Sequence, residues 1–294
     1  MNNQKTNKTL FLRDGRRLGF SDLGDPNGFP LFYFHGFPSS RLEALAGDEL
    51  SSQHKVRLIA IDRPGIGRSD FKSQRTLLDW PDDVQELADA LQIEKFSAIG
   101  ISGGGPYLMA CAYKIPERLI HCGSVCGLGP VHTPWEINGM SVVNRLGLTI
   151  SKNAPWAASL FMGSITPLMQ FFPEYLLNLM SGDAPDCDKK ALKETDFTQI
   201  MVKAAQEAFR SGSVGLSQDL IIYGSHWDFD VANIKIPVKI WHGEKDTVVP
   251  IIFAKYFETF IPECETIYYP DDGHISIVPN HFSTFIKTLT TPIQ

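Results

Sequence analysis

Three residues far apart in the chain have the types needed for nucleophilic catalysis by serine. Ser102 lies in the glycine-rich segment GISGGGP (100–106), Asp246 lies in HGEKDTVVP, and His274 lies in YPDDGHISI. A serine hydroxyl is a weak nucleophile unless a base takes its proton, and an acid must orient that base. The order Ser, Asp, His is one of the chain orders in which this chemistry occurs. Together the three residues could cleave a carboxylic ester through an acyl-enzyme.

The segment around Ser102 predicts a sharp turn from a strand into a helix. The apolar run KFSAIGI (95–101) predicts a strand, and PYLMACAYKI (106–115) predicts a helix with proline in its first turn. Such a turn strains the central residue and requires small neighbours, which Gly100 and Gly104 supply. Because Gly-x-Ser-x-Gly also occurs in turns that only connect a strand to a helix, the motif alone is a hypothesis.

Two backbone N–H groups could stabilise the oxyanion that forms during ester cleavage. One is the N–H of Gly103, at the N-terminus of the predicted helix. The second comes from the loop FHGFPSS (34–40), where Phe37 can donate but Pro38 has no N–H. A plain connecting loop is the alternative interpretation of this segment.

The positions of Asp246 and His274 favour them over nearby competitors. Each follows an apolar run, PVKIWHG (237–243) and ETIYY (265–269) respectively, which predicts strands ending at the same sheet edge as Ser102. Glu244, Asp271 and Asp272 are alternative carboxylates. An acid could also come from the end of the strand predicted at 119–128. Residues 123–130 contain no carboxylate, however, which favours Asp246 as the acid.

The alternation of predicted strands and helices organises the rest of the chain. Asp14-Gly15 predicts a hairpin within 8–24, and the further elements are strands at 30–36, 56–62 and 119–128 and helices at 39–53, 250–261 and 275–289. This rhythm predicts a parallel sheet flanked by helices. It stops at residue 130 and resumes near 235, so we expect a core of residues 1–130 and 235–294. Residues 131–234 lack strand signals and predict an all-helical insertion, or cap.

Side chains of the cap could form the roof of an apolar substrate pocket. We expect the pocket to include some of the following residues, although packing within the cap is an alternative role for each of them: His35, Trp135, Trp156, Phe161 and Met162. The stretch 156–172 is unusually apolar, and a buried pair of cap helices explains it better than contact with a membrane.

Composition excludes several classes of function. The 294 residues carry a net charge of −6 and no basic cluster, so nucleic acid is not an expected partner. The five cysteines fit neither a disulfide framework nor a zinc site, and Cys122 and Cys126 are expected to be small apolar residues of a buried strand. With no stretch long enough to span a membrane and no apolar leader, the sequence predicts a cytoplasmic protein without stable membrane insertion.

Five ordered motifs together resemble the α/β-hydrolase family: HGFPSSR (35–41), DRPGIGRSD (62–70), GISGGG (100–105), GEKDTVVP (243–250) and DGH (272–274). The resemblance covers nearly the whole chain outside the insertion. It implies an eight-stranded, mostly parallel sheet with a cap inserted after the sixth strand. It also implies Ser102, His274 and Asp246 as the catalytic triad, with Phe37 and Gly103 as oxyanion donors. Asp62, Arg63, Gly65 and Gly67 match a segment that mainly shapes a loop in this family.

Departures from relatives narrow the expected activity. Haloalkane dehalogenases and epoxide hydrolases of this fold use an aspartate nucleophile, which Ser102 replaces here, and proline iminopeptidases carry tryptophan where this chain has Gly103. The sequence therefore predicts a serine hydrolase that cleaves a small or medium carboxylic ester and needs no metal or organic cofactor. A carbon–carbon bond or amide hydrolase with the same triad, and a non-catalytic small-molecule receptor, remain alternatives.

Overall fold

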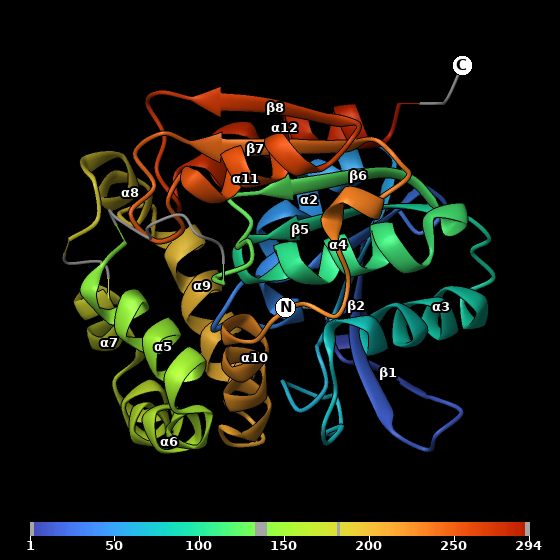
Figure 1. Cartoon of the computed structure of the whole chain (residues 1–294). Helices are drawn as coiled ribbons and strands as arrows, with labels where there is room; N and C mark the ends of the chain where they lie inside the picture. Colours follow the sequence, from blue (N-terminus) through green and yellow to red (C-terminus); the bar gives the residue numbers. More distant parts are fainter. Residues whose placement is uncertain (1–2, 133–139, 181–182, 292–294) are drawn as a thin grey trace.

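One eight-stranded sheet runs through the computed structural model, which describes residues 3–132, 140–180 and 183–291 (Figure 1). The strands lie in the order β1-β2-β4-β3-β5-β6-β7-β8. Their bounds are β1 Lys8–Phe11, β2 Arg17–Gly24, β3 Phe29–Phe34, β4 Val56–Ile61, β5 Phe96–Ile101, β6 Leu119–Val125, β7 Val238–Gly243 and β8 Cys264–Tyr269. The hairpin β1–β2 is antiparallel, β2 pairs antiparallel with β4, and all later pairs are parallel. The predicted fold class is confirmed.

Side chains on alternate strand positions build two apolar cores, one on each face of the sheet. On β3, Phe32 and Phe34 belong to the first core, whereas Leu31 and Tyr33 belong to the second. Every residue of β5 is buried, as expected for a strand covered by helices on both faces. The strand that carries the chain into Ser102 is therefore fixed from both sides.

The flanking helices divide between these two cores. Side chains of α3 (Trp80–Ala90), α4 (Gly105–Lys114) and α11 (Ile252–Phe260) contribute to the first core. Those of α12 (Ile277–Leu289) contribute to the second, beside the segment formed by a 3₁₀ helix at Arg41–Gly47 and α2 (Asp48–Gln53). The predicted helix at 39–53 is thus two shorter pieces.

A group of helices lies between β6 and β7 in the chain: α5 Val142–Asn153, α6 Pro155–Phe171, α7 Pro173–Met180, α8 Asp186–Ala191, α9 Thr195–Ala208 and α10 Val214–Gly224. In the described part of 131–234 no strand interrupts them. The arrowheads of β6, β7 and β8 point toward the side where these helices gather (Figure 1). They therefore lie beyond the carboxyl ends of the strands, where ligands bind in parallel sheets.

The strand predicted at 119–128 ends earlier, at Val125. Cys126 has a φ of +45°, a left-handed conformation that stops strand pairing, and its N–H donates to the carbonyl oxygen of Trp241 on the next strand. Cys126 is buried in the second core, as expected of a small apolar residue, but it lies just past the end of the strand and not within it. No helix in the described ranges is long and apolar enough to cross a membrane.

Candidate active site

Ser102 stands at the turn where β5 passes into a short 3₁₀ helix (Ser102–Gly104) and then α4. Its φ of +52° is a strained conformation for a residue with a side chain. A β-carbon on Gly104 would lie 2.1 Å from the carbonyl oxygen of Phe34, and one on Gly100 would lie 2.7 Å from the carbonyl oxygen of Gly104. Only glycine fits at either position, so the two glycines allow the turn that exposes the hydroxyl of Ser102.

The structure brings Ser102, His274 and Asp246 together in one hydrogen-bonded chain. Ser102 Oγ lies 2.9 Å from Nε2 of His274, a residue 172 positions away in the sequence. Nδ1 of the same ring lies 2.7 Å from Oδ2 of Asp246. The carboxylate can only accept, so Nδ1 carries the proton and Nε2 is free to accept the hydroxyl proton of Ser102. This is the tautomer that a general base requires.

Backbone donors and a second histidine hold the carboxylate of Asp246. Its Oδ1 accepts hydrogen bonds from the N–H groups of Val248 and Val249, each at 2.8 Å. His242 lies behind it, with Nε2 donating to the carbonyl oxygen of Val249 at 2.8 Å and standing 3.6 Å from Asp246 Oδ2. Both oxygens of the carboxylate are therefore engaged, which fixes the direction from which it meets the ring of His274.

Burial and nearby charge oppose each other in setting the pKa values of this pair. Burial alone would lower the pKa of His274, but the negative charge and hydrogen bond of Asp246, with smaller contributions from Asp188 and Glu43, raise it above the ordinary 6.5. Burial alone would raise the pKa of Asp246, but His274 and the backbone donors lower it. Asp246 is thus a carboxylate and stabilises positive charge on the imidazole.

Phe37 and Gly103 lie near Ser102, at the serine end of the hydrogen-bonded residues. Both line the same cavity as Ser102. A β-carbon on Gly103 would lie 2.8 Å from Cβ of Phe37 and 2.7 Å from the hydroxyl of Tyr223, so glycine is required for this close approach. The two residues whose N–H groups are candidates for the oxyanion hole are therefore neighbours in space.

A buried ion cluster holds the loop that contains Phe37. The guanidinium of Arg63 donates to the carbonyl oxygens of His35 and Gly36, at 2.5 and 2.9 Å, and its Nε donates to Asp219 at 2.6 Å. Asp219 also pairs with Arg75 and accepts from the hydroxyl of Tyr107 at 2.7 Å. Because Asp219 lies on α10, this cluster fixes the loop to the inserted helices.

Sequence reasoning missed the roles of Asp219, Tyr223 and Arg75. One signal was present: Asp219 is the only charged residue in the apolar segment LSQDLIIYG (216–224), and a carboxylate inside such a helix needs a buried partner. Its partners come from other parts of the chain and are not marked by any motif. The alternatives for the acid lie elsewhere, since Asp271 pairs with Lys245 and Asp272 accepts from Asn280 and His281.

A cavity of about 260 Å³ opens beside Ser102. Its walls come from the core through Leu128 and Val249, and from the inserted helices through Leu148, Leu176 and Leu220. Phe161 and Met162, both expected in the pocket, line it as well. No lining residue in the described ranges is charged. The cavity is therefore suited to an apolar group attached to the atom that Ser102 would attack.

Two expected pocket residues lie elsewhere. His35 is completely buried behind its loop, where Nδ1 donates to the carbonyl oxygen of Gly36 at 2.9 Å, and it does not line the cavity. Trp156 is 74% exposed because it lies on the outer side of α6, so this prediction was also wrong. Trp135 lies outside the described residues.

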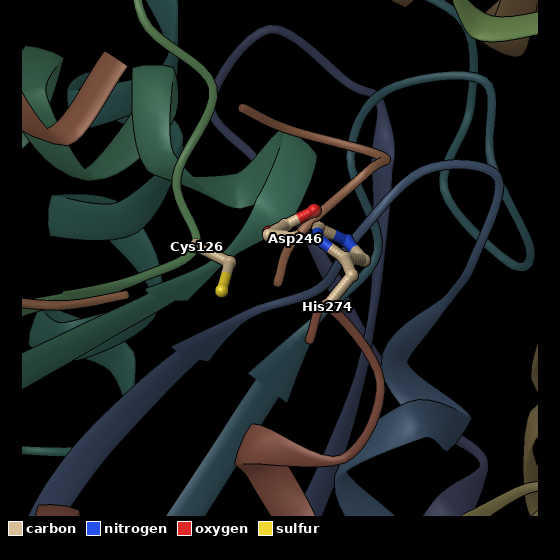
Figure 2. A group of neighbouring side chains, drawn as sticks. All are labelled: Cys126, Asp246 and His274. Carbon is tan, nitrogen blue, oxygen red and sulfur yellow. Dashed lines mark hydrogen bonds and ion pairs between the residues drawn. The ribbon is translucent and has the colours of Figure 1, made fainter. Parts of the chain in front are cut away.

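Cys126 is completely buried and lies beside Asp246, on the opposite side from the ring of His274 (Figure 2). Cys126, Asp246 and His274 each offer a potential metal ligand, and these atoms lie within 4.8 Å of one another. Burial raises the pKa of the thiol, and Asp246 raises it further. A metal needs the thiolate and would displace the proton shared by Asp246 and His274, so the donor set fits a protonated thiol beside the hydrogen-bonded residues better than a metal site.

Comparison with known proteins agrees with this architecture. The sequence profile of the alpha/beta hydrolase fold matches residues 30–280. The chain is 27% identical to a non-heme chloroperoxidase of Streptomyces lividans over 82% of this chain and 83% of the relative. It is 24% identical to the AB hydrolase superfamily protein YisY of Bacillus subtilis (strain 168), over 87% and 88%. The solved structure of an esterase from Exiguobacterium antarcticum superposes with a TM-score of 0.65 at 19% identity, covering 97% of this chain and all of that one.

Proposed function

This chain belongs to the alpha/beta hydrolase fold family, and from that premise we propose that it is a serine hydrolase that cleaves carboxylic esters with an apolar acyl group. The hydrogen-bonded chain from Ser102 through His274 to Asp246 carries the proposal. The exposed side of Ser102 faces an uncharged cavity, and two candidate oxyanion donors stand beside it.

In the first step, Nε2 of His274 takes the proton of Ser102 as Oγ attacks the ester carbonyl carbon. Negative charge develops on the carbonyl oxygen, where the N–H groups of Phe37 and Gly103 would hold it. Asp246 stabilises the imidazolium that forms. His274 then gives its proton to the leaving alcohol oxygen, the carbon–oxygen bond breaks, and an acyl-enzyme on Ser102 remains.

In the second step, His274 takes a proton from water, whose oxygen attacks the acyl carbon. The same two N–H groups hold the second oxyanion, and the proton returns from His274 to Ser102 Oγ as the carboxylic acid leaves. Nε2 of His274 carries every proton in both steps, so loss of His274 stops both halves of the reaction.

The cavity supports a small or medium apolar acyl group as the substrate feature. Its volume of about 260 Å³ is just below the usual range of ligand pockets, about 300–1,000 Å³. An anionic acyl group would lose its hydration there without a cation to replace it. We also propose that residues 131–234 act as the cap over this cavity, because Phe161, Met162 and Leu176 of these helices line it.

A fluorophosphonate probe and a series of p-nitrophenyl esters test this function. We expect covalent labelling at Ser102, loss of labelling in Ser102→Ala, and turnover that is fastest for acyl chains that fit the cavity. The conservative variant Ser69→Ala is the control, because Ser69 is buried in the loop after β4 and its hydroxyl bonds the carbonyl oxygen of Asp62 and the N–H of Gly19, away from Ser102.

Other outcomes would point to the other functions. Labelling at Ser102 with turnover of amides or of carbon–carbon substrates, but not of esters, would replace the ester specificity while keeping the triad. Tight binding of small apolar ligands without labelling or turnover would contradict an enzyme and favour a receptor on this fold.

A further inference from the structure

Asp188 is a buried carboxylate of the inserted helices that contacts the loop carrying His274. It lies on α8, and its side chain is fully buried. Its Oδ2 accepts from the backbone N–H of His274 at 2.9 Å, and its Oδ1 accepts from the N–H groups of Ile275 and Ser276 at 3.0 and 2.9 Å. Three consecutive N–H groups thus converge on one side chain that is 86 residues away in sequence.

We propose that Asp188 is the positioning residue of the catalytic base: it fixes the loop from which His274 reaches Ser102. This inference rests on the proposed function. The loop leads into α12, whose N-cap Ser276 makes no side-chain hydrogen bond to the helix. Its hydroxyl instead accepts from the N–H of Gly273 at 2.9 Å. The three backbone N–H groups of residues 274–276 are therefore held from α8, outside the core.

Gly273, the residue before His274, leaves the space that the Asp188 carboxylate occupies. A β-carbon on Gly273 would lie 2.5 Å from Oδ2 and 2.6 Å from Oδ1 of Asp188. Any side chain at position 273 would push the carboxylate off its three donors. Glycine at 273 and aspartate at 188 are thus matched, although neither belongs to the catalytic chain itself.

The negative charge of Asp188 raises the pKa of His274 through space, from the backbone side of that residue. In the described ranges no lysine or arginine forms an ion pair with Asp188. The other charged or titratable groups around His274 are Asp246 on its Nδ1 side, with His242 and Cys126 behind that carboxylate, and Glu43 from the segment before α2. Asp188 therefore adds negative charge from the backbone side of His274 and favours the imidazolium that the reaction forms.

Asp188→Asn is the direct test. An asparagine can still accept through Oδ1, but its amide nitrogen is a donor that would face a backbone donor. We expect a loss in kcat of about ten-fold or more, because small displacements of a catalytic group are costly. We also expect the NMR titration of the His274 imidazole to move to lower pH, since a negative charge is removed. Asp186→Asn, at an exposed position of the same helix, is the matched control and should change neither.

Gly273→Ala tests the same contact while keeping the charge, and it carries the test if Asp188→Asn does not fold. The added methyl group displaces the carboxylate, so we expect a similar loss in kcat. A folded variant of either kind with wild-type kcat and a wild-type His274 titration would overturn the proposal. The titration, assigned by the signal lost in His274→Asn, does not depend on turnover. If the wild-type protein neither labels nor hydrolyses esters, the proposed function falls, while the titration still decides the role of Asp188.

Discussion

The hydroxyl of Tyr223, on α10, donates a hydrogen bond to the carbonyl oxygen of Gly103 at 2.9 Å. Its ring also meets that of Phe37 edge to face, with centroids 5.5 Å apart. One side chain from the inserted helices thus touches both residues whose N–H groups are proposed as oxyanion donors. The spacing of those two donors depends on where α10 is seated.

Tyr223→Phe keeps the ring and removes the hydrogen bond. We expect the free energy of unfolding to fall by about 1 kcal/mol, because the buried carbonyl of Gly103 loses its partner. We expect a larger proportional effect on kcat than on KM, since the donors act on the transition state. Urea unfolding and steady-state kinetics measure the two effects. Tyr113→Phe, near the C-terminal end of α4, where the ring stacks on Phe229, is the matched control. An unchanged kcat in Tyr223→Phe would contradict the role.

The pH dependence of kcat/KM should follow the imidazole of His274. The base works only when neutral, and the charge of Asp246 raises its pKa above 6.5 despite burial. Activity should therefore fall as pH decreases, with the midpoint of that fall above pH 6.5. A stopped-flow pH profile with one p-nitrophenyl ester measures this, and a flat profile between about pH 5 and 9 would exclude His274 as the base.

Asp246→Asn should leave the fold in place and nearly abolish turnover. An amide at this position can orient the wrong tautomer of His274, and the same change in a serine protease triad costs about 10⁴-fold in kcat. The acid-side midpoint of the remaining activity should move to lower pH, because the carboxylate that raises the pKa of His274 is gone. Residual activity within about ten-fold of the wild type would argue for a different acid.

Asp219→Asn should destabilise the protein strongly. The carboxylate and its two arginine partners are buried, so the substitution leaves Arg63 and Arg75 without a counter-charge. Breaking one partner of a buried ion pair costs about 3–5 kcal/mol, which urea unfolding can measure. Asp82→Asn, in an exposed pair with Lys114, should cost far less.

The lowered pKa of Asp219 predicts that the folded protein loses stability in acid. Burial alone would raise the pKa of Asp219, but Arg63 and Arg75 lower it from 3.8 to about 2. A depressed pKa gives stability that is present above pH 3.8 and is lost as pH falls toward 2. The melting temperature should therefore fall between pH 5 and pH 2. In Asp219→Asn, the part of that fall that comes from Asp219 should be absent.

Residues that line the cavity should set the preferred acyl length. Phe161→Ala enlarges the cavity, so we expect the ratio of kcat/KM for octanoyl over acetyl esters to rise by about ten-fold or more. Trp156→Ala, on the exposed side of the same helix, should leave the ratio unchanged. Equal effects of the two substitutions would mean that the acyl group binds outside this cavity.

The sheet and the proposed catalytic residues follow from local sequence. Strands such as 96–101 are short apolar runs, and the residues at their ends meet because parallel strands share one edge. That rule selected Ser102, Asp246 and His274 together with the glycine-rich motif around Ser102 and the chain order Ser, Asp, His. Trp156 was placed wrongly because an apolar helix has no marker for which side faces the cavity.

The supporting contacts could not be predicted in the same way. Asp188, Asp219 and Tyr223 each act across more than 80 residues of sequence. Asp188 and Tyr223 bond backbone groups that any residue would offer, whereas Asp219 bonds the side chains of Arg63 and Arg75. Nothing in their local segments shows which loop they meet, since that depends on how the inserted helices dock. Only the rarity of a carboxylate in an apolar helix, as at Asp219, points to a buried partner.

Because α8 holds the loop of His274 and α10 holds the loops of Phe37 and Gly103, the helices between β6 and β7 are not an interchangeable module. Replacing residues 140–224 with the corresponding helices of a relative would change the substrate pocket and would also remove Asp188, Asp219 and Tyr223 together. A hybrid protein designed for a new specificity should therefore keep these three side chains. Without them, we expect a folded protein in which Ser102 is inactive.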